Sequence, residues 1–336
     1  SNSGSYTNGA QVAITADAPA SGKIFDQWTG DTQYVASVSS TNTTVTMPAQ
    51  PIILTATYKD APYYALTVTS AYGGSDPSGT NSYNTPVSIM VTNSPVLNDT
   101  TQYVCVGWTG TGSAPANGTT TNTGLFTMTN DSTLVWLWTT NYLLQVDKTG
   151  SGSVSTSNVW LADGTNIQIT ATADAYYHFI SWSGDTGGDT NSSPLILVMS
   201  GARSVTANFA PNITTNTATP EWWLAQYGLT NFNTDALTDI DLDSMATWQE
   251  YIAGTDPTNR SSVLAVACTV FPNGHRTLSW FGVQGRAYTL QYVDSLNTNN
   301  WQSSSFESSG LDAAISLTDD QIEPKYFYRV KVRIVE

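Results

Sequence analysis

Basic residues are scarce in this sequence. Only 11 of its 336 residues are Lys or Arg, against 26 Asp and Glu, which gives a formal net charge of −15. A protein that binds nucleic acid needs a stripe or patch of positive charge to neutralise phosphates. Because the chain has no such stripe, we expect no nucleic-acid partner.

Long apolar runs are also absent. The sequence has no stretch of 18 consecutive apolar residues, and it does not open with a charged segment followed by an apolar one. The first absence predicts that no helix spans a membrane. From the second we expect either that a signal peptide has been removed or that the sequence begins within a longer protein.

Cysteine and histidine are rare, with two residues of each type. Cys105 and Cys268 lie in apolar, strand-like runs, so we expect both to be buried free thiols. His178 and His275 have no nucleophile motif beside them, and the chain contains no GxSxG, HExxH, P-loop or paired metal-binding cysteines. The sequence therefore predicts a protein that is not an enzyme.

Thr, Ser, Asn and Gly are abundant instead, together with 11 Trp, 17 Tyr and 9 Phe. This composition suits short strands joined by polar turns and predicts a mainly β fold. A chain of this length exceeds one ordinary hydrophobic core, so we expect several domains. The low lysine content and the Thr and Asn richness also favour a secreted protein.

Three segments of the first two-thirds of the chain align with one another, at periods of 80 and 74 residues. Each has a tryptophan, a glycine two residues later and a methionine further downstream. The equivalent residues are Trp28, Gly30 and Met47, then Trp108, Gly110 and Met128, then Trp182, Gly184 and Met199. Apolar and polar residues alternate in each segment, which predicts half-buried strands.

The shared signature is an aromatic-x-x-Trp-[Thr/Ser]-Gly core followed by a closing strand, TATY, LVWLW or TANF. It resembles the divergent internalin B-type repeat, a small β-grasp-like module common in bacterial surface proteins. The resemblance implies repeat 1 over residues 1–60, repeat 2 over 61–140 and repeat 3 over 141–210. Repeat 2 departs most, through a long insertion rich in Gly, Thr and Asn.

Repeat 1 has no counterpart of the strands that open the other two repeats, at 64–69 (YALTVT) and 142–146 (YLLQV). We expect either that the chain is truncated before this strand or that another molecule supplies it.

Three further segments follow the repeats. Residues 211–220 contain two prolines and are interpreted as a linker. Residues 221–262 predict a helical module, with helices over EWWLAQYGL and ATWQEYIAG, the second ended by Gly254. Residues 263–336 predict a β-sandwich. Through Trp280, Tyr288, Tyr292 and Tyr328, this segment resembles the fibronectin type III-like end domains of secreted bacterial proteins.

The helical module contains acidic residues at the twelve-residue spacing of an EF-hand loop. The candidate ligands are Asp239, Asp241, Asp243, the Met245 carbonyl, Thr247 and Glu250. Without a cation, neighbouring carboxylates repel one another by roughly 1 kcal/mol per pair in water. An acidic helix N-terminus satisfied by the helix dipole and water is the alternative interpretation.

The residues that flank the loop resemble the thrombospondin type 3-like and dockerin-like calcium modules of secreted bacterial proteins. This resemblance implies a structural Ca²⁺ ion and Asp256 as an additional ligand. The departure from the family pattern is Ser244, which stands where glycine is usual and which we expect to weaken the site.

Two hypotheses of function follow. In the first, the chain is an extracellular structural or adhesive protein of the bacterial surface that self-associates into a head-to-tail filament. Residues 329–336 alternate basic and apolar side chains and would donate a strand to repeat 1 of a neighbour, although they also suit the last strand of the sandwich.

In the second hypothesis, these are accessory modules of a larger secreted hydrolase that bind carbohydrate or another cell-surface ligand. Aromatic side chains that stack on sugar rings would then carry the binding. The candidates are Trp138, Trp160, Trp222 and Trp223.

Overall fold

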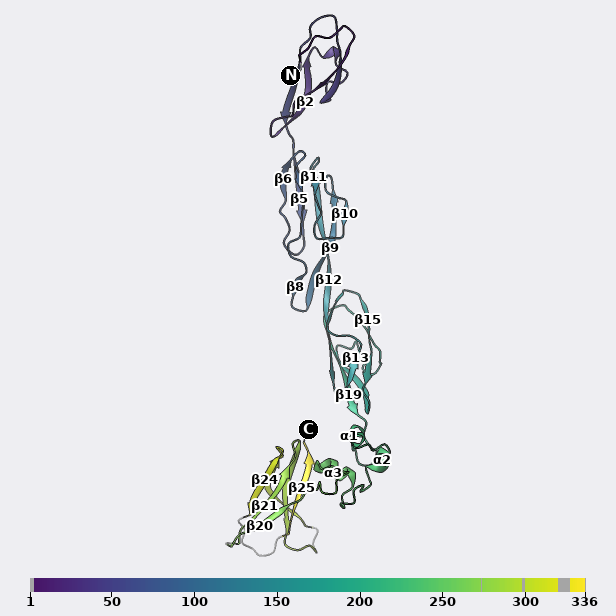
Figure 1. Ribbon diagram of the computed structural model, residues 1–336, viewed down its shortest axis with the longest axis vertical. Helices are drawn as coiled ribbons and strands as arrows, with labels where there is room; N and C mark the ends of the chain where they lie inside the picture. The colour runs from purple at the N-terminus through teal and green to yellow at the C-terminus, as the bar shows by residue number, and fades with distance from the viewer. Residues whose placement is uncertain (1–2, 273, 298–299, 320–326, 336) are drawn as a thin grey trace. The chain divides into compact units, whose positions relative to one another are not determined.

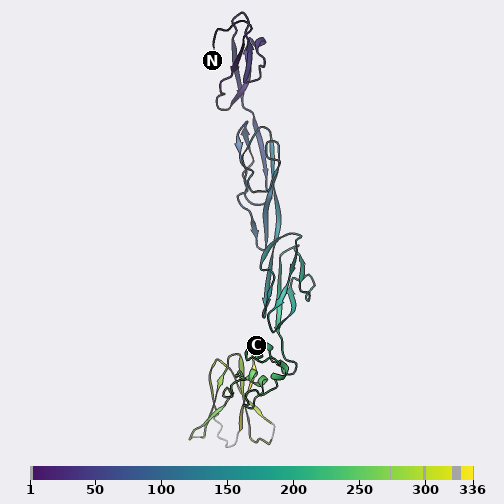
Figure 2. The same cartoon turned by 45° about the vertical axis from the view of Figure 1, so that its right-hand side comes forward.

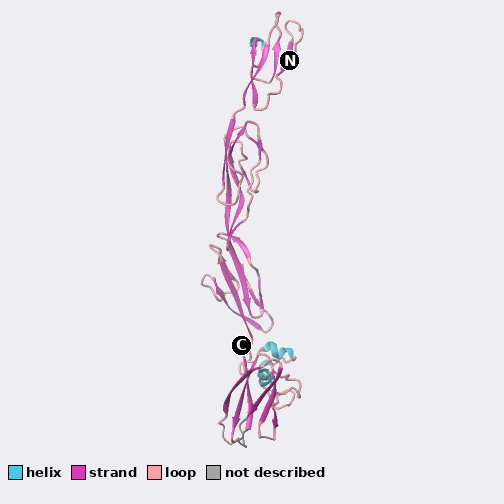
Figure 3. Ribbon diagram, turned by 90° about the vertical axis from the view of Figure 1, so that its left-hand side faces the viewer, coloured by secondary structure: helices cyan, strands magenta, loops and turns pink. Residues whose placement is uncertain are grey.

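Strands dominate the structure, a computed structural model that describes residues 3–272, 274–297, 300–319 and 327–335. The three α-helices are short, which confirms the predicted mainly β fold (Figure 3). None of the helices in the described ranges has the length and apolar character needed to cross a membrane. The chain divides into two compact units: residues 1–144 with 158–167 and 198–203, and residues 145–157 and 168–197 with 204–336.

Repeat 1 is a small module of two strand pairs. Strand β1 (Gln11–Thr15) pairs antiparallel with β3 (Asn42–Thr46), and β2 (Lys23–Gly30) pairs antiparallel with β4 (Leu54–Asp60). A single 3-10 turn, Thr32–Tyr34, follows β2 in the sequence. Trp28 on β2 and Val45 on β3 are buried.

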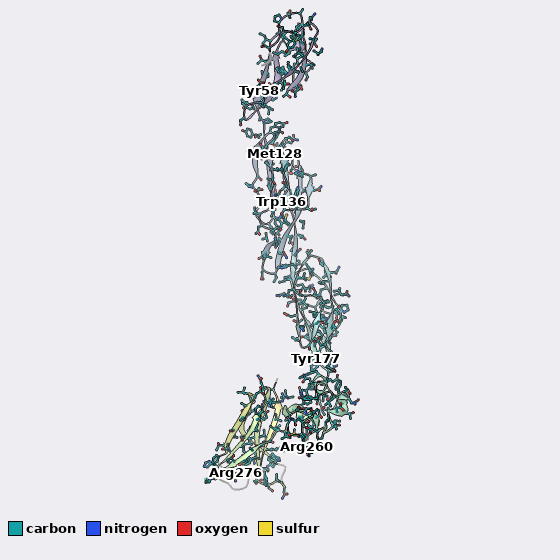
Figure 4. All side chains as sticks on the ribbon, viewed as in Figure 1. Tyr58, Met128, Trp136, Tyr177, Arg260 and Arg276 are labelled. Atoms are coloured by element: carbon teal, nitrogen blue, oxygen red, sulfur yellow. The ribbon has the colours of Figure 1, made fainter. Side chains whose placement is uncertain are left out.

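Repeat 2 is larger, and its strands surround a core that includes Met128 and Trp136 (Figure 4). The strands are β5 (Tyr63–Thr69), β6 (Gly79–Ser82), β7 (Pro86–Val87), β8 (Val96–Asn98), β9 (Thr101–Thr111), β10 (Asn117–Gly118), β11 (Phe126–Thr127) and β12 (Ser132–Thr149). Strand β12 runs antiparallel to β9 and parallel to β5. This parallel pairing of the first and last strands agrees with the predicted β-grasp-like arrangement.

Strand β12 is shared by two repeats. The sequence predicts separate strands for LVWLW and YLLQV, but the structure joins them in one strand of 18 residues. The other strands of repeat 3 are β13 (Gly152–Val154), β14 (Val159–Ala162), β15 (Asn166–Ile169), β16 (Ala171–Ala173), β17 (Tyr177–Gly184), β18 (Leu195–Val198) and β19 (Arg203–Pro211). Strand β19 lies between β12 and β17 in the sheet.

The repeat tryptophans occupy equivalent positions in their sheets. Trp28 lies opposite Ala56, Trp108 opposite Trp136 and Trp182 opposite Ala207, each on the strand that closes its module. In all three modules the register shifts within the three residues before the tryptophan, as in a β-bulge. All three tryptophans are buried.

The repeat methionines are equivalent as well, because the backbone of each closes the same kind of turn. The hydrogen bonds are Gly9 N to Met47 O (2.8 Å) and Met47 N to Ala10 O (2.9 Å), Asn84 N to Met128 O (2.9 Å) and Met128 N to Thr85 O (3.0 Å), and Gly164 N to Met199 O (2.7 Å) and Met199 N to Thr165 O (2.9 Å). The three repeats are therefore built alike, repeat 2 with its long insertion included.

Repeat 1 differs at the strand that closes it. Strands β12 and β19 have neighbours on both edges, whereas β4 pairs with β2 alone among the described residues. The inward side chains of β4, Leu54, Ala56 and Tyr58, are correspondingly only half-buried. The core of this module is thus less enclosed than those of the other two.

The segment after repeat 3 contains the three α-helices of the described residues, α1 (Glu221–Gln226), α2 (Phe232–Asp235) and α3 (Thr247–Ala253). They surround a small core of Trp223, Leu224 and Ala236. Both helices predicted from sequence are present, and Gly254 ends α3 with a φ of 79°. Of residues 211–220, interpreted as a linker, Pro211 is the last residue of β19, and the rest form a loop in which Thr214 and Thr219 are buried.

The C-terminal segment is a sandwich of two three-stranded sheets (Figure 2). Its strands are β20 (Ala267–Val270), β21 (Arg276–Gly282), β22 (Arg286–Val293), β23 (Gln302–Ser309), β24 (Ala313–Asp319) and β25 (Phe327–Ile334). One sheet has the order β20-β21-β24 and the other β23-β22-β25. Leu278, Trp280, Tyr288 and Leu290 form the core between them.

One prediction about the cysteines is wrong. Both thiols are free, and Cys105 is buried as expected, but Cys268 is exposed. It lies on β20, an edge strand that pairs only with β21 among the described strands and whose four residues are all exposed. The apolar run around Cys268 therefore does not mark a buried strand.

Candidate metal centre

The acidic loop joins α2 to α3, and its carboxylates converge. One oxygen from each of Asp239, Asp241 and Asp243 lies within 4.8 Å of the other two. All three residues are half-buried, and Glu250 follows in the first turn of α3 with its side chain fully buried. The spacing seen in the sequence thus brings the three aspartate carboxylates together within one tight loop.

Backbone N–H groups of the loop donate hydrogen bonds to four of the six oxygens of the three aspartates. Asp243 N donates to Asp239 Oδ1 and to Asp241 Oδ1, each at 3.2 Å, and Ser244 N donates to Asp239 Oδ2 at 2.9 Å. Met245 N donates to Asp243 Oδ1 at 2.7 Å. These bonds orient the aspartates toward the interior of the loop.

The remaining oxygens have no such partner. Within the described part of the chain, Asp241 Oδ2, Asp243 Oδ2 and Glu250 Oε2 are buried and accept no hydrogen bond. A buried carboxylate oxygen without a partner is costly, because it has lost its water without replacement. Three of them in one loop are the arrangement that a hard cation would satisfy.

The environment of Glu250 also disfavours a negative charge. Burial of the carboxyl group, together with the charges of the nearby Asp241 and Asp243 carboxylates, raises the pKa of Glu250 to about 7. Thr255 Oγ1 donates to Glu250 Oε1 at 3.3 Å and offsets part of this effect. Sequence reasoning missed Thr255, since it follows the loop and belongs to no recognised spacing.

Ser244 has the backbone conformation that the loop pattern requires of glycine. Its φ is 82°, in the left-handed region that disfavours residues with a Cβ. The sequence comparison with EF-hand loops therefore located the strained position correctly.

The other three predicted ligands are Met245, Thr247 and Asp256, and they differ in whether they belong to the loop. Met245 is half-buried in the loop. The buried hydroxyl of Thr247 donates to Thr238 O at 2.9 Å. Asp256 lies beyond α3, and its Oδ1 accepts from the backbone N–H and the hydroxyl of Thr258 at 3.0 and 2.7 Å. Asp256 is not part of the converging cluster.

The predicted sugar-stacking tryptophans have structural contacts. Trp223 is buried, and Trp222 packs against the same helical core. Trp138 is half-buried and meets Tyr72 edge-on, with ring centroids 5.7 Å apart. Trp160 lies half-buried on β14.

The two histidines lie apart from the acidic loop in the sequence. The exposed His178 contacts Asn212 Oδ1 through Nδ1 at 2.9 Å, and His275 is half-buried beside β21.

The predicted donor strand is paired inside its own sandwich. Strand β25 pairs antiparallel with β22 along its whole length, from Phe327 to Ile334. Of the predicted segment 329–336, Glu336 lies outside the described residues. Donation of this segment would therefore break the pairing of β25 with β22.

Two parts of the chain are similar to a known domain family. Residues 1–62 and 142–213 match the family model described as the divergent InlB B-repeat domain. These ranges correspond to repeats 1 and 3, which confirms the resemblance of those two repeats to the internalin B-type module. No curated protein matches the chain.

Proposed function

We propose that this chain is a non-enzymatic structural or adhesive protein of the bacterial surface, located outside the cell. The equivalence of the three repeat modules carries the proposal, since tandem modules of one kind suit surface proteins better than enzymes. The match of repeats 1 and 3 to a domain typical of bacterial surface proteins supports it.

We further propose that the loop 239–250 binds a structural Ca²⁺ ion. The buried, unpartnered oxygens of Asp241, Asp243 and Glu250 support this proposal. Asp239 and the Met245 carbonyl would complete the set of oxygen ligands, with Thr247 at the ninth position of the loop. Ca²⁺ accepts such a flexible set of oxygens, whereas Mg²⁺ demands a near-octahedral one.

Isothermal titration of the full chain with CaCl₂, repeated with MgCl₂, tests the cation site. We expect one Ca²⁺ per chain. In Asp241→Ala we expect the affinity for Ca²⁺ to fall by about 100-fold or more, because the ion loses one of its carboxylate ligands. At 100 times the dissociation constant, Ca²⁺ should stabilise the wild type by about 2.7 kcal/mol. Asp147→Asn, an exposed acid elsewhere, is the matched control.

A wild-type chain whose heat of titration and melting temperature are both unchanged by Ca²⁺ would contradict the cation proposal. Equal affinities of Asp241→Ala and Asp147→Asn would place the bound ion elsewhere.

For assembly, we propose that the edge of β4 in repeat 1 accepts an extended strand from a neighbouring molecule. The half-buried side chains of β4 support this, since a strand at that edge would cover them as β5 and β12 cover the other closing strands. Repeated contacts of this kind between one end of a chain and the other would generate a head-to-tail filament. A strand donated by residues 329–336 would first have to leave β22.

Sedimentation velocity over a series of protein concentrations tests assembly. We expect larger species that disappear when a peptide with the sequence of residues 142–149, the opening strand of repeat 3, is added in excess. A peptide of the same composition in scrambled order should have no effect. A chain that stays monomeric at every concentration, or oligomers indifferent to both peptides, would refute strand addition at β4.

A further inference from the structure

Helix α3 lies between the acidic loop and the C-terminal sandwich. One of its residues belongs to the candidate cation site, and the next two contact the sandwich. Glu250 directs a fully buried carboxylate away from solvent, and its Oε2 has no hydrogen-bond partner among the described residues, like Oδ2 of Asp241 and of Asp243 in the loop. Tyr251 and Ile252, the next two residues, present their backbone carbonyls to the sandwich. Figure 1 shows α3 beside β25, and residues of the two elements are in contact.

Arg286 makes the polar contact between the helix and the sandwich. Its Nε donates to Ile252 O at 2.7 Å, and its Nη2 donates to Tyr251 O at 2.6 Å. Its guanidinium carbon lies 5.7 Å from the centre of the Tyr251 ring. A planar guanidinium that donates to two adjacent carbonyls fixes both distance and orientation, which a lysine cannot do.

Arg286 is held rigidly at its own end. It is the first residue of β22, where it lies opposite Ile334 of β25, and the next two residues, Ala287 and Tyr288, are buried in the sandwich. The arginine therefore extends to the helix from a backbone position that the sandwich fixes.

Tyr251 is held on its other side by the helical core. Its ring meets Trp223 with centroids 5.1 Å apart, and Trp223 in turn packs against Tyr227 at 5.0 Å. The same tyrosine thus touches the core of the helical module and the arginine of the sandwich.

The end of α3 lies too close to the sandwich to admit a side chain. A Cβ on Gly254 would lie 2.9 Å from Val283 Cγ1, and the residue has a φ of 79°. Gly254 N and Thr255 N both donate to Glu250 O, at 2.7 and 3.1 Å. The turn that ends the helix is therefore tied to the residue that faces the loop.

We propose that Arg286 couples the cation site to the C-terminal sandwich through α3. This inference rests on the proposed binding of Ca²⁺ by the loop. A cation held by Glu250 fixes the position of α3 and with it the two carbonyls that Arg286 binds, so the loop sets the attachment of the sandwich. Coupling of this kind is reciprocal, so loss of the arginine contact lowers the affinity of the loop for Ca²⁺ by the same factor.

Two measurements on the full chain test the coupling, calorimetric titration with CaCl₂ and hydrogen exchange of the peptide that covers β22. In the wild type we expect Ca²⁺ to slow exchange in β22. In Arg286→Gln we expect Ca²⁺ affinity to fall by about 5-fold or more, with no effect of Ca²⁺ on β22. Arg333→Gln removes an exposed arginine of the same sandwich, paired with Glu307, and should behave as the wild type.

The outcomes separate the two proposals. A wild type that binds no Ca²⁺ would overturn the cation site itself. A wild type that binds Ca²⁺, with Arg286→Gln equal to it in affinity and in exchange at β22, would overturn the coupling and leave the site intact. Should Arg286→Gln fail to fold, as shown by unprotected amides in β24, Arg286→Lys provides the second variant. It keeps the charge but not the paired donors, and unchanged affinity and exchange in it would overturn the coupling as well.

Discussion

At the level of single residues, Ser244 has a backbone conformation that its side chain disfavours. With a φ of 82°, its Cβ costs on the order of 1 kcal/mol relative to glycine. Its N–H still donates to Asp239 Oδ2, so the strain accompanies a bond that orients a candidate ligand. The strain therefore falls on the loop whose carboxylates converge.

Replacement of Ser244 by glycine is expected to relieve this strain. We predict that Ser244→Gly raises Ca²⁺ affinity about 3- to 5-fold, the equivalent of roughly 1 kcal/mol, in a calorimetric titration. Ser261→Gly, in the same module but at a residue without positive φ, should leave affinity unchanged. A lower affinity in Ser244→Gly would show that the serine itself assists the site.

Residue spacing was enough to predict that the carboxylates of Asp239, Asp241 and Asp243 converge, because alternating positions in a tight loop point to one side. It was not enough to predict Thr255 or the unpartnered oxygens, which depend on how α3 packs above the loop. Burial was also misjudged at Cys268, since an apolar run looks the same on an edge strand as in a core.

At the level of elements, the glycine two residues after the repeat tryptophan ends the strand in repeats 1 and 3. A Cβ on Gly184 would lie 2.2 Å from Ser204 O, and one on Gly30 would lie 2.2 Å from Ile53 O. The φ values of these two glycines are 90° and 99°. The Trp-x-Gly pattern thus marks a place where β2 and β17 leave no room for a side chain beside the backbone that leads into or forms the closing strand.

Substitution of such a glycine is expected to weaken one module. We predict that Gly184→Ala lowers the local stability of repeat 3 by at least about 2 kcal/mol, because the backbone must move away from Ser204. Hydrogen exchange of peptides that cover β17 and β19 measures this change. Gly201→Ala is the control in the same repeat, since a Cβ there meets nothing within 4 Å. Similar exchange in both variants would contradict the assignment of this role to Gly184.

The repeated alternation of apolar and polar residues also predicted the order of the strands in the repeats. It did not predict how long each strand is. The sequence shows two apolar runs between Leu134 and Val146, and nothing in them predicts that they form one strand. Pairing partners decide where a strand ends, and β12 continues because β9, β14 and β19 supply partners along it.

At the level of the whole molecule, the mainly β fold could be predicted from internal repeats and composition. The contact between α3 and Arg286 could not, because it joins residues 34 and 35 positions apart through backbone carbonyls that have no sequence signature. For the same reason, the half-buried side chains of β4 become visible only when its sheet is compared with those of the other repeats.

The parallel pairing of β5 with β12 has a mechanical consequence. The chain enters repeat 2 through β5 and leaves it through β12, and Leu66–Thr69 lies beside Ser132–Val135 in the same direction. A pull on the two ends of this module therefore slides the two strands along each other and loads their hydrogen bonds together. Bonds stretched in shear yield at higher force than bonds opened one after another, so the module is built to resist tension along the chain.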